Sequence, residues 1–454
     1  MTDFAQSLRD SVAANFESTV DDLSALVAIP GIAWDAFDAA EVERSANAVA
    51  ELVRDVGFAD VEILRATTPE GTPGAPAIVA SRPAPAGQPT VLLYAHHDVQ
   101  PPGDRKLWLT EPFTAERRET RLFGRGAADD KAGIMAHLAA IRALGDSLNV
   151  GVTLFFEGEE EAGSPSFRNF LETYRAKLDA DVIVVADSSN WAIGVPALTS
   201  SLRGLASLDI ELATLDHAVH SGMYGGPIPD AATAMFRLLA TLHDEAGNVA
   251  IDGLATAPRP ELDYDEATFR KDSGLLDGVE LIGTGSISER LWAKPAVAVI
   301  GLDLPDVAVA SNTIRESVKA KISVRLAPGD DPESALEALK KHLIENVPFG
   351  ARLEFGAEEA GKPWSANLDS PAVQIAHTAL SDAFGTESVN IGLGGSIPFI
   401  ADLLEVFPAA EILVTGVEDP DSRAHSANES LHLPDFQNAI VAEALLLARL
   451  GGQD

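Results

Sequence analysis

The stretch Val152–Ser164 reads VTLFFEGEEEAGS, a short and mostly apolar run that ends directly in a cluster of carboxylates. Such a run is typical of a strand buried in a sheet. Three similar runs occur, at Ala77–Ser81, Val91–Ala95 and Val182–Ala186, with helical stretches such as Lys131–Leu144 between them. This alternation predicts an α/β domain with a mixed, mostly parallel sheet flanked by helices. Ligand sites of such sheets lie just past the strand C-termini, so the carboxylates mark a candidate site.

From Leu202 onward the predicted elements follow another order, βαββαβ, which is the ferredoxin-like order of an α+β domain. Residues Asn248–Lys294 within it are rich in Gly, Pro and Asp without a clear period, which predicts a long insertion. We therefore expect residues 1–200 and 363–454 to form one domain and residues 201–362 to form a second, inserted domain. The six elements expected in the second domain are strand Gly204–Ala213, helix Asp230–Glu245, strands Ala296–Leu302 and Ser317–Leu326, helix Pro332–Glu345 and strand Ala351–Phe355.

Composition narrows the class of protein. The 454 residues carry 33 basic and 69 acidic side chains, a net charge of −36, which disfavours binding to nucleic acid and anionic membranes. There is no cysteine, so disulfides, thiolate zinc sites and cysteine nucleophiles are excluded and any metal must be held by His, Asp and Glu. Asp3, Arg9 and Asp10 lie where the apolar region of a signal peptide would be. We expect a soluble, cytoplasmic protein.

Two motifs place carboxylates and histidine after predicted strands. In YAHHDVQP, His96 and Asp98 are two residues apart and share one face of a strand, as a metal ligand and its orienting carboxylate would; a structural His–Asp pair is the alternative. In GRGAADDKAG, Asp129 and Asp130 are adjacent before a helix. One explanation is a helix cap with a solvated neighbour. A cap accounts for only one of these two carboxylates, and a bridging cation would account for the other.

The glutamates of the opening stretch can have different roles. Glu160 and Glu161 are consecutive, so in an extended segment their side chains diverge, and one can bind a metal while the other acts as general base on a nearby water. Glu157 and Glu159 are expected to support these two or to be solvated.

Asp187 and His425 are weak signals singly but complete a ligand set. Asp187 ends the apolar run VIVVAD, and His425 lies in SRAHSANES. Together with His96, Asp129 and Glu161 they give five nitrogen and oxygen ligands, enough for two divalent ions ~3.5–4 Å apart that share one carboxylate. A serine hydrolase and a nucleotide-binding enzyme are disfavoured, because GxSxG, GxGxxG and GxxxxGK[ST] do not occur.

These motifs resemble those of the M20 metallopeptidases. YAHHDVQP, GRGAADDKAG, EGEEEAGS, the strand ending in Asp187, HSGMYGG and RAHSANE occur in that family's order and spacing, and look most like its dipeptidase and carnosinase branch. The resemblance implies that the first domain is a catalytic di-metal peptidase domain and the second a lid and dimerisation domain. It also assigns roles in the metal site: His96 and Asp187 on one ion, Glu161 and His425 on the other, Asp129 bridging, Asp98 orienting His96, Glu160 as general base, and a cis peptide between Asp129 and Asp130.

The resemblance further implies roles in the inserted domain. His220, in HSGMYGG, would polarise the scissile carbonyl in the active site of a partner subunit, so the protein would be a homodimer. Asn312 and Arg325 would contact substrate, although Thr is commoner at the position of Asn312 in the carnosinase group. Ser396, in GLGGSIP, would belong to a substrate-contacting loop. Ala95 and Arg423 depart from the residues usual in the family.

The expected function is metal-dependent hydrolysis of dipeptides by a two-metal-bound hydroxide with a Glu general base. Two divalent ions per subunit are expected, with Zn²⁺ preferred and Mn²⁺ or Co²⁺ as alternatives. The nearest alternative keeps the chemistry and changes the substrate, to N-acyl amino acids or N-succinyl-diaminopimelate. A non-catalytic metal- or peptide-binding protein is a third hypothesis, which loss of Glu160 or of a ligand would favour. None of these residues is lost.

Overall fold

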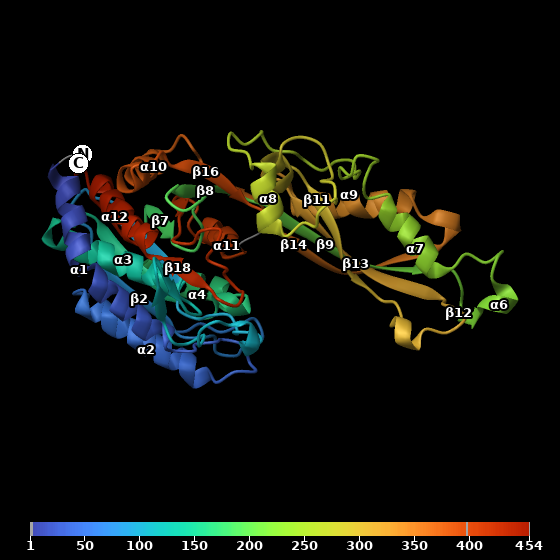
Figure 1. The fold of residues 1–454 in the computed structure, drawn as a ribbon, viewed down its shortest axis with the longest axis horizontal. Coiled ribbons are helices and arrows are strands. Elements are labelled where there is room, and N and C mark those ends of the chain that lie inside the picture. Colours follow the sequence, from blue (N-terminus) through green and yellow to red (C-terminus); the bar gives the residue numbers. More distant parts are fainter. Residues whose placement is uncertain (1–2, 396–397, 454) are drawn as a thin grey trace. The chain divides into compact units, whose positions relative to one another are not determined.

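The computed structural model describes residues 3–395 and 398–453, which divide into two compact units (Figure 1). Unit 1 consists of Met1–Ser200, Ala366–Ile391 and Asp402–Asp454. Unit 2 consists of Ser201–Ser365 and Gly392–Ala401. The second unit is thus formed largely by one continuous segment inserted into the chain of the first.

A mixed sheet forms the centre of unit 1, as predicted, with the strand order β1-β2-β6-β3-β7-β17-β8-β15 and with β16 paired to β8. The four central strands β6, β3, β7 and β17 run parallel, and antiparallel pairs flank them on both sides. Among the described residues the strands of this sheet are β1 (Val61–Leu64), β2 (Ala77–Arg82), β3 (Thr90–His96), β6 (Gly151–Glu157), β7 (Val182–Val185), β8 (Ala197–Leu202), β15 (Trp364–Ser365), β16 (Val389–Leu393) and β17 (Glu411–Val414).

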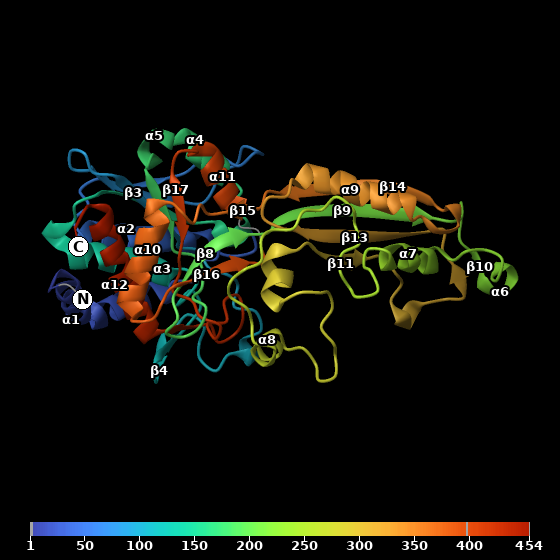
Figure 2. The same cartoon turned by 90° about the horizontal axis from the view of Figure 1, so that it is seen from above.

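Helices cover both faces of the parallel strands. Val91, Leu93 and Ala95 alternate along β3 and face a core shared with helices α1, α2, α3, α10 and α12, whereas the ring of Tyr94 points to the opposite face and contacts Phe155. Figure 2 shows α4 and α5 on that opposite face. The helices of unit 1 are α1 (Asp3–Val27), α2 (Ala39–Asp55), α3 (Lys131–Leu144), α4 (Phe167–Thr173), α5 (Arg175–Leu178), α10 (Pro371–Phe384) and α12 (Leu433–Leu450); α11 spans Pro398–Val406.

The connections place the C-terminal end of β3 at a reversal of strand order. From β3 the chain crosses through α3 to β6 on one side, and from β6 it returns through α4 and α5 to β7 on the other side. The crevice outside such a reversal is where α/β sheets bind ligands. A separate three-stranded sheet, β18 (Ser430–His432), β5 (Arg121–Phe123) and β4 (Glu116–Arg118), joins the C-terminal part of the chain to the segment that leads into α3.

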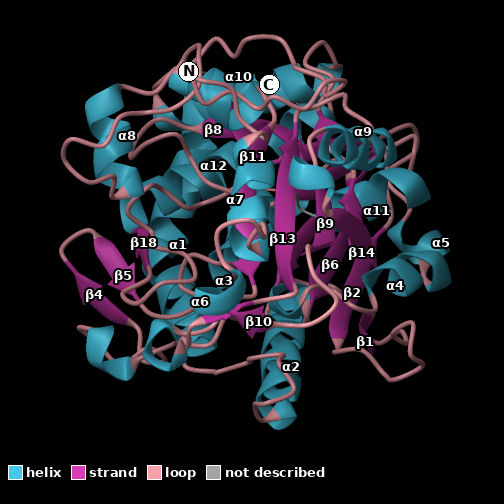
Figure 3. Cartoon of the chain, turned by 90° about the vertical axis from the view of Figure 1, so that its right-hand side faces the viewer, coloured by secondary structure: helices cyan, strands magenta, loops and turns pink. Residues whose placement is uncertain are grey.

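Unit 2 has the predicted βαββαβ order. Its antiparallel sheet has the strand order β11-β13-β9-β14 (Figure 3), and α7 and α9 pack on one face of it. The predicted helix Asp230–Glu245 is shorter in the structure and ends at Ala240. Beyond it the chain turns at Asp244, whose side chain accepts the N–H groups of Ala246 and Asn248. These elements are β9 (Gly204–Ala213), α7 (Ala231–Ala240), β11 (Ala296–Leu302), β13 (Ser317–Leu326), α9 (Pro332–Glu345) and β14 (Arg352–Gly361).

The smaller elements of unit 2 are a strand pair and the long insertion. β10 (Val219–His220) pairs with β12 (Thr313–Ile314), and helix α6 (Ser221–Tyr224) follows β10 directly. The insertion Asn248–Lys294 contains helix α8 (Glu266–Ser273) and a π-helical turn, Glu289–Ala293. In the described part of the chain, no helix combines the length and apolar character that a membrane crossing needs.

Candidate metal centre

Five candidate ligands converge at the C-terminal ends of the central strands of unit 1. His96 is the last residue of β3, and Glu161 and Asp187 follow β6 and β7. Asp129 lies just before α3, and His425 lies in the loop that leads into β18. Because parallel strands end at one edge of a sheet, three chain segments that are far apart in sequence deliver their side chains to one place.

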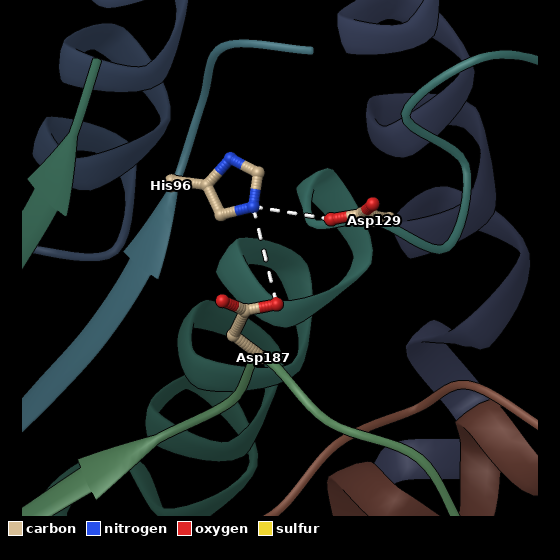
Figure 4. Close-up of side chains that lie close together, drawn as sticks. All are labelled: His96, Asp129 and Asp187. Atoms are coloured by element: carbon tan, nitrogen blue, oxygen red, sulfur yellow. Dashed lines mark hydrogen bonds and ion pairs between the residues drawn. The ribbon is translucent and has the colours of Figure 1, made fainter. Parts of the chain in front are cut away.

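The first group of ligand atoms is buried around His96 (Figure 4). Its Nε2 lies 3.1 Å from Oδ1 of Asp129 and 4.0 Å from Oδ1 of Asp187. One ligand atom from each of the three residues lies within 4.8 Å of the other two. This spacing suits one cation held by one imidazole and two carboxylates.

The second group shares Asp129 with the first. Nε2 of His425 lies 3.0 Å from Oδ2 of Asp129 and 3.2 Å from Oε2 of Glu161. The two oxygens of Asp129 therefore face different histidines, which is the arrangement of a carboxylate that bridges two ions. His425 differs from His96 in exposure, because 59% of its side chain is accessible, and in backbone, because its φ is +61°.

Asp98 organises both sides of the centre. Its Oδ1 lies 3.3 Å from Nδ1 of His96, which leaves Nε2 to face the ligand carboxylates. The same carboxylate accepts the backbone N–H groups of Glu160 and Glu161, each at 3.1 Å. One buried side chain thus orients the imidazole and fixes the turn that carries both glutamates.

The electrostatics of the centre favour added positive charge. Burial alone would lower the pKa of His96, but hydrogen bonds with Asp129 and Asp98 raise it well above its ordinary value. Hydrogen bonds with Asp129 and Glu161 raise the pKa of His425 to about 11. Burial, with repulsion from Asp129 and Glu161, raises the pKa of Asp187 to about 6. Protons are held tightly where divalent cations would take their place, so the residues fit a two-ion site.

Glu160 sits beside this centre without belonging to either ligand group. Burial, followed by repulsion from Asp187, raises the pKa of its carboxyl group to about 9. Glu157 and Glu159, for which a solvated position was one expectation, are both buried. Glu157 accepts the hydroxyl of Tyr94 at 2.6 Å, and Glu159 accepts the N–H groups of Ala75 and Ser166, both at 2.7 Å. Both side chains therefore support the end of β6 through hydrogen bonds and are not solvated.

The helix-cap explanation for the aspartate pair is wrong. Asp130 occupies the N-cap position of α3 but makes no side-chain capping bond, and its Oδ2 instead accepts the backbone N–H of His96 at 3.2 Å. The peptide between Asp129 and Asp130 is cis, as the family resemblance predicted.

Two further residues that the sequence did not single out support Glu161. The backbone N–H of Gln100 donates to Oε1 of Glu161 at 3.1 Å, and its side-chain amide donates to Oε2 at 2.7 Å. Nε1 of Trp34 donates to the backbone oxygen of Glu161 at 2.9 Å. Gln100 belongs to the YAHHDVQP motif, which is a signal that could have identified it; Trp34 has no such signal.

The remaining predicted site residues belong to unit 2. His220 ends β10 and is exposed, and its Nδ1 accepts the N–H of Gly222 at 3.0 Å. Asn312 precedes β12, and its backbone oxygen accepts the N–H of Ser221 at 3.0 Å, which brings it next to His220. Arg325 lies on β13 and is half-buried. Ser396 lies outside the described residues.

The model of peptidase family M20/M25/M40 matches residues 92–449, most of the chain and all five candidate ligands. The chain belongs to this family. The M20 relatives include a cysteinylglycine-S-conjugate dipeptidase of Corynebacterium striatum, 37% identical over 373 residues, or 80% of this chain and 81% of the relative. A Beta-Ala-His dipeptidase of Rattus norvegicus is 28% identical over 86% of this chain and 84% of its own. Among solved structures, human carnosine dipeptidase 1 has the same fold, with a TM-score of 0.79 and 24% identity over 99% of both chains.

Proposed function

We propose that this protein is a metal-dependent dipeptidase that hydrolyses the peptide bond of small peptides. The observation that carries the proposal is the pair of ligand groups that share Asp129, with Glu160 beside them. The M20 family match and the dipeptidase relatives support peptide-bond hydrolysis as the chemistry. His96 and Asp187 would hold one ion, and Glu161 and His425 the other.

Two divalent cations, when bound, supply Lewis-acid polarisation of the scissile carbonyl and acidification of a water. Glu160 takes the proton of the attacking water and later delivers it to the leaving amine. Asp98 keeps Nε2 of His96 turned towards the ions and holds the backbone of Glu160 in place.

Zn²⁺ is the proposed metal, with Mn²⁺ and Co²⁺ as alternatives. The ligand set contains two imidazoles and three carboxylates and no thiolate, and each of these ions accepts such donors. A titration of the metal-free protein with each ion would rank them.

Unit 2 is proposed to act as a lid that grips substrate. Because Nδ1 of His220 accepts the N–H of Gly222, its Nε2 carries the proton and is available to polarise a carbonyl oxygen. Burial and the neighbouring Arg325 lower the pKa of Arg203 to about 10, so two guanidinium groups lie close together in this unit. Such a pair favours an anion, and a peptide carboxylate is one that Arg can bind bidentately. Asn312 and Ser396 remain proposed substrate contacts.

We also propose that two copies associate through unit 2. Its edge strand β11 reads AVAVIGL and leaves Val299, Ile300 and Leu302 exposed. An apolar edge strand has unpaired backbone groups that can extend a sheet into a second chain. A homodimer formed in this way would cover the strand.

The test is hydrolysis of a panel of dipeptides and N-acyl amino acids by the purified protein, first stripped of metal with a chelator and then reloaded with Zn²⁺ or Mn²⁺. Cleavage of dipeptides that depends on added metal is the expected result. Cleavage of acyl amino acids alone would contradict the proposed substrate class. Stoichiometric metal binding without any hydrolysis would contradict catalysis.

A further inference from the structure

A buried ion pair lies outside the five ligands and joins the loops that carry them. Nη1 of Arg125 lies 2.6 Å from Oε2 of Glu429, and both side chains are almost fully buried. Arg125 belongs to the segment that leads to Asp129, and Glu429 lies four residues beyond His425. Neither residue has a role in the proposed mechanism, as a metal ligand or as a substrate contact.

The carboxylate of Glu429 fixes the backbone on the N-terminal side of Asp129. Its Oε1 accepts the N–H of Ala128 at 2.9 Å and that of Asp129 itself at 3.1 Å. Its Oε2 accepts the N–H of Gly126 at 3.1 Å in addition to the guanidinium. Four donors therefore converge on one carboxylate, and one of them is the peptide group of the bridging residue.

Arg125 extends the same connection to two more segments. Its Nη2 donates to the backbone oxygen of Ser426 at 3.3 Å, directly after His425. The same nitrogen donates to the backbone oxygen of Pro101 at 3.4 Å, in the segment that follows His96 and Asp98. The pair thus contacts three ligand-bearing segments, although those segments come from distant parts of the sequence.

The chemistry of the pair argues against simple filling of the core. A buried carboxylate close to other carboxylates is unfavourable unless donors surround it, and breaking a buried ion pair leaves an uncompensated charge. An apolar pair of the same volume would pack the loop without that penalty but could not fix four separate N–H groups in direction. Residues that orient ligands from outside the coordination sphere act in this way.

We infer that Arg125 and Glu429 are positioning residues that hold Asp129 so that its two oxygens face the two ion sites. This inference rests on the proposed two-ion centre. Because Asp129 belongs to both ligand groups, loss of the pair weakens both ion sites together and not one alone.

The test is titration of metal-free protein with Co²⁺, whose visible absorption reports its coordination. The wild type is expected to bind two ions per chain; failure to do so would overturn the proposed function itself. Glu429→Gln keeps the shape but has only one acceptor oxygen for four donors. We expect it to bind both ions about 10–100-fold more weakly, at an unchanged number of sites.

A matched control separates positioning from folding. Glu443 is also a buried carboxylate of unit 1, and its ion pair is with His137 of α3 and not with a candidate ligand. Glu443→Gln should leave both Co²⁺ affinities unchanged. A purely structural role for Glu429 would give fewer binding sites of wild-type affinity, because the unfolded fraction is simply lost, and that result would overturn the inference.

A second variant tests the positioning role if Glu429→Gln does not fold. Arg125→Lys retains a positive charge beside Glu429 but has no second nitrogen for Ser426 and Pro101. We expect weaker binding of both ions by this variant, with a smaller change than for Glu429→Gln. Wild-type affinity in Arg125→Lys would overturn the inference.

Discussion

The two units of the molecule differ in the burial of their candidate site residues. In unit 1, histidines and carboxylates are gathered at the ends of buried strands, and Asp98 holds the turn of Glu160 and Glu161 by hydrogen bonds within the same unit. In unit 2, His220 and Asn312 are exposed near the short β10–β12 pair, and the edge strand β11 leaves apolar side chains uncovered.

The difference shows which contacts hold the polar side chains of each unit in place. Buried charges must be paired, so contacts within unit 1 hold the buried candidate ligands His96, Asp129 and Glu161 in place. Exposed groups on short strands gain little from their own fold, and in unit 2 they suit contacts with substrate or with a second chain. Variants in each unit can test what that unit contributes to turnover, metal binding and association.

The largest effect on turnover is expected from a substitution among the buried polar residues of unit 1. Glu160→Gln removes the proton acceptor and should lower kcat by about 10²–10⁴-fold, with both ions still bound because Glu160 belongs to neither ligand group. Steady-state kinetics together with metal analysis of the same sample measure this. Wild-type turnover in the variant would remove Glu160 from the mechanism.

A smaller effect on turnover is expected from a substitution among the exposed polar residues of unit 2. His220→Ala should lower kcat by about 10²–10³-fold, the usual cost of losing one donor to a developing oxyanion, without changing metal affinity. His217→Ala is the matched control, because His217 is also exposed and lies three residues upstream. Equal effects of the two substitutions would show that His220 has no special role.

Association through unit 2 can be tested at its edge strand. Ile300 is 60% exposed on β11, and Ile300→Lys places a charge where a second strand would pair, so the dimer should dissociate on the order of tenfold more readily. Sedimentation over a range of protein concentrations measures this. Val307→Lys, at a 92% exposed position outside the strand, is the control. A wild type that is monomeric throughout would contradict the proposed dimer.

The smallest effect concerns stability and pH. Nδ1 of His137 lies 2.6 Å from Glu443; burial lowers the pKa of His137, but the carboxylate raises it above 6.5 overall. The folded state therefore holds this proton more tightly than the unfolded chain, so the stabilisation is full below pH 6.5 and is lost as pH rises through the raised pKa.

Glu443→Gln should thus lower Tm by a few degrees at pH 6 and by less at pH 9. Thermal unfolding of the wild type and the variant at both pH values measures this. A difference in Tm that grows with pH would contradict the stated direction of the pKa shift.

Much of the architecture could be predicted because local patterns determine it. The apolar run Val152–Phe156 became the centre of β6, and the helix expected over Lys131–Leu144 has those bounds in the structure. The helix expected over Asp230–Glu245 is shorter, and Asp244 lies in the turn that follows its end at Ala240. Side-chain bonds of this kind compete with helix formation, and the spacing of apolar residues does not reveal them.

The residue types available for a metal site follow from the amino-acid sequence. The absence of cysteine left only His, Asp and Glu as metal ligands, and the motifs placed such residues directly after the predicted strands. These are properties of composition and of order along the chain, so they can be read without coordinates.

How those residues meet in space depends on the folded chain. The two oxygens of Asp129 face His96 and His425, which are 329 residues apart in the numbering (425 − 96). Asp130 binds the backbone of His96 where a helix cap was an alternative, and Glu429 reaches back to the N–H of Asp129. Such contacts depend on which strand ends and loops lie side by side. The packing of the whole unit sets that arrangement. A local sequence pattern cannot specify it, because the partner residues are far apart along the chain.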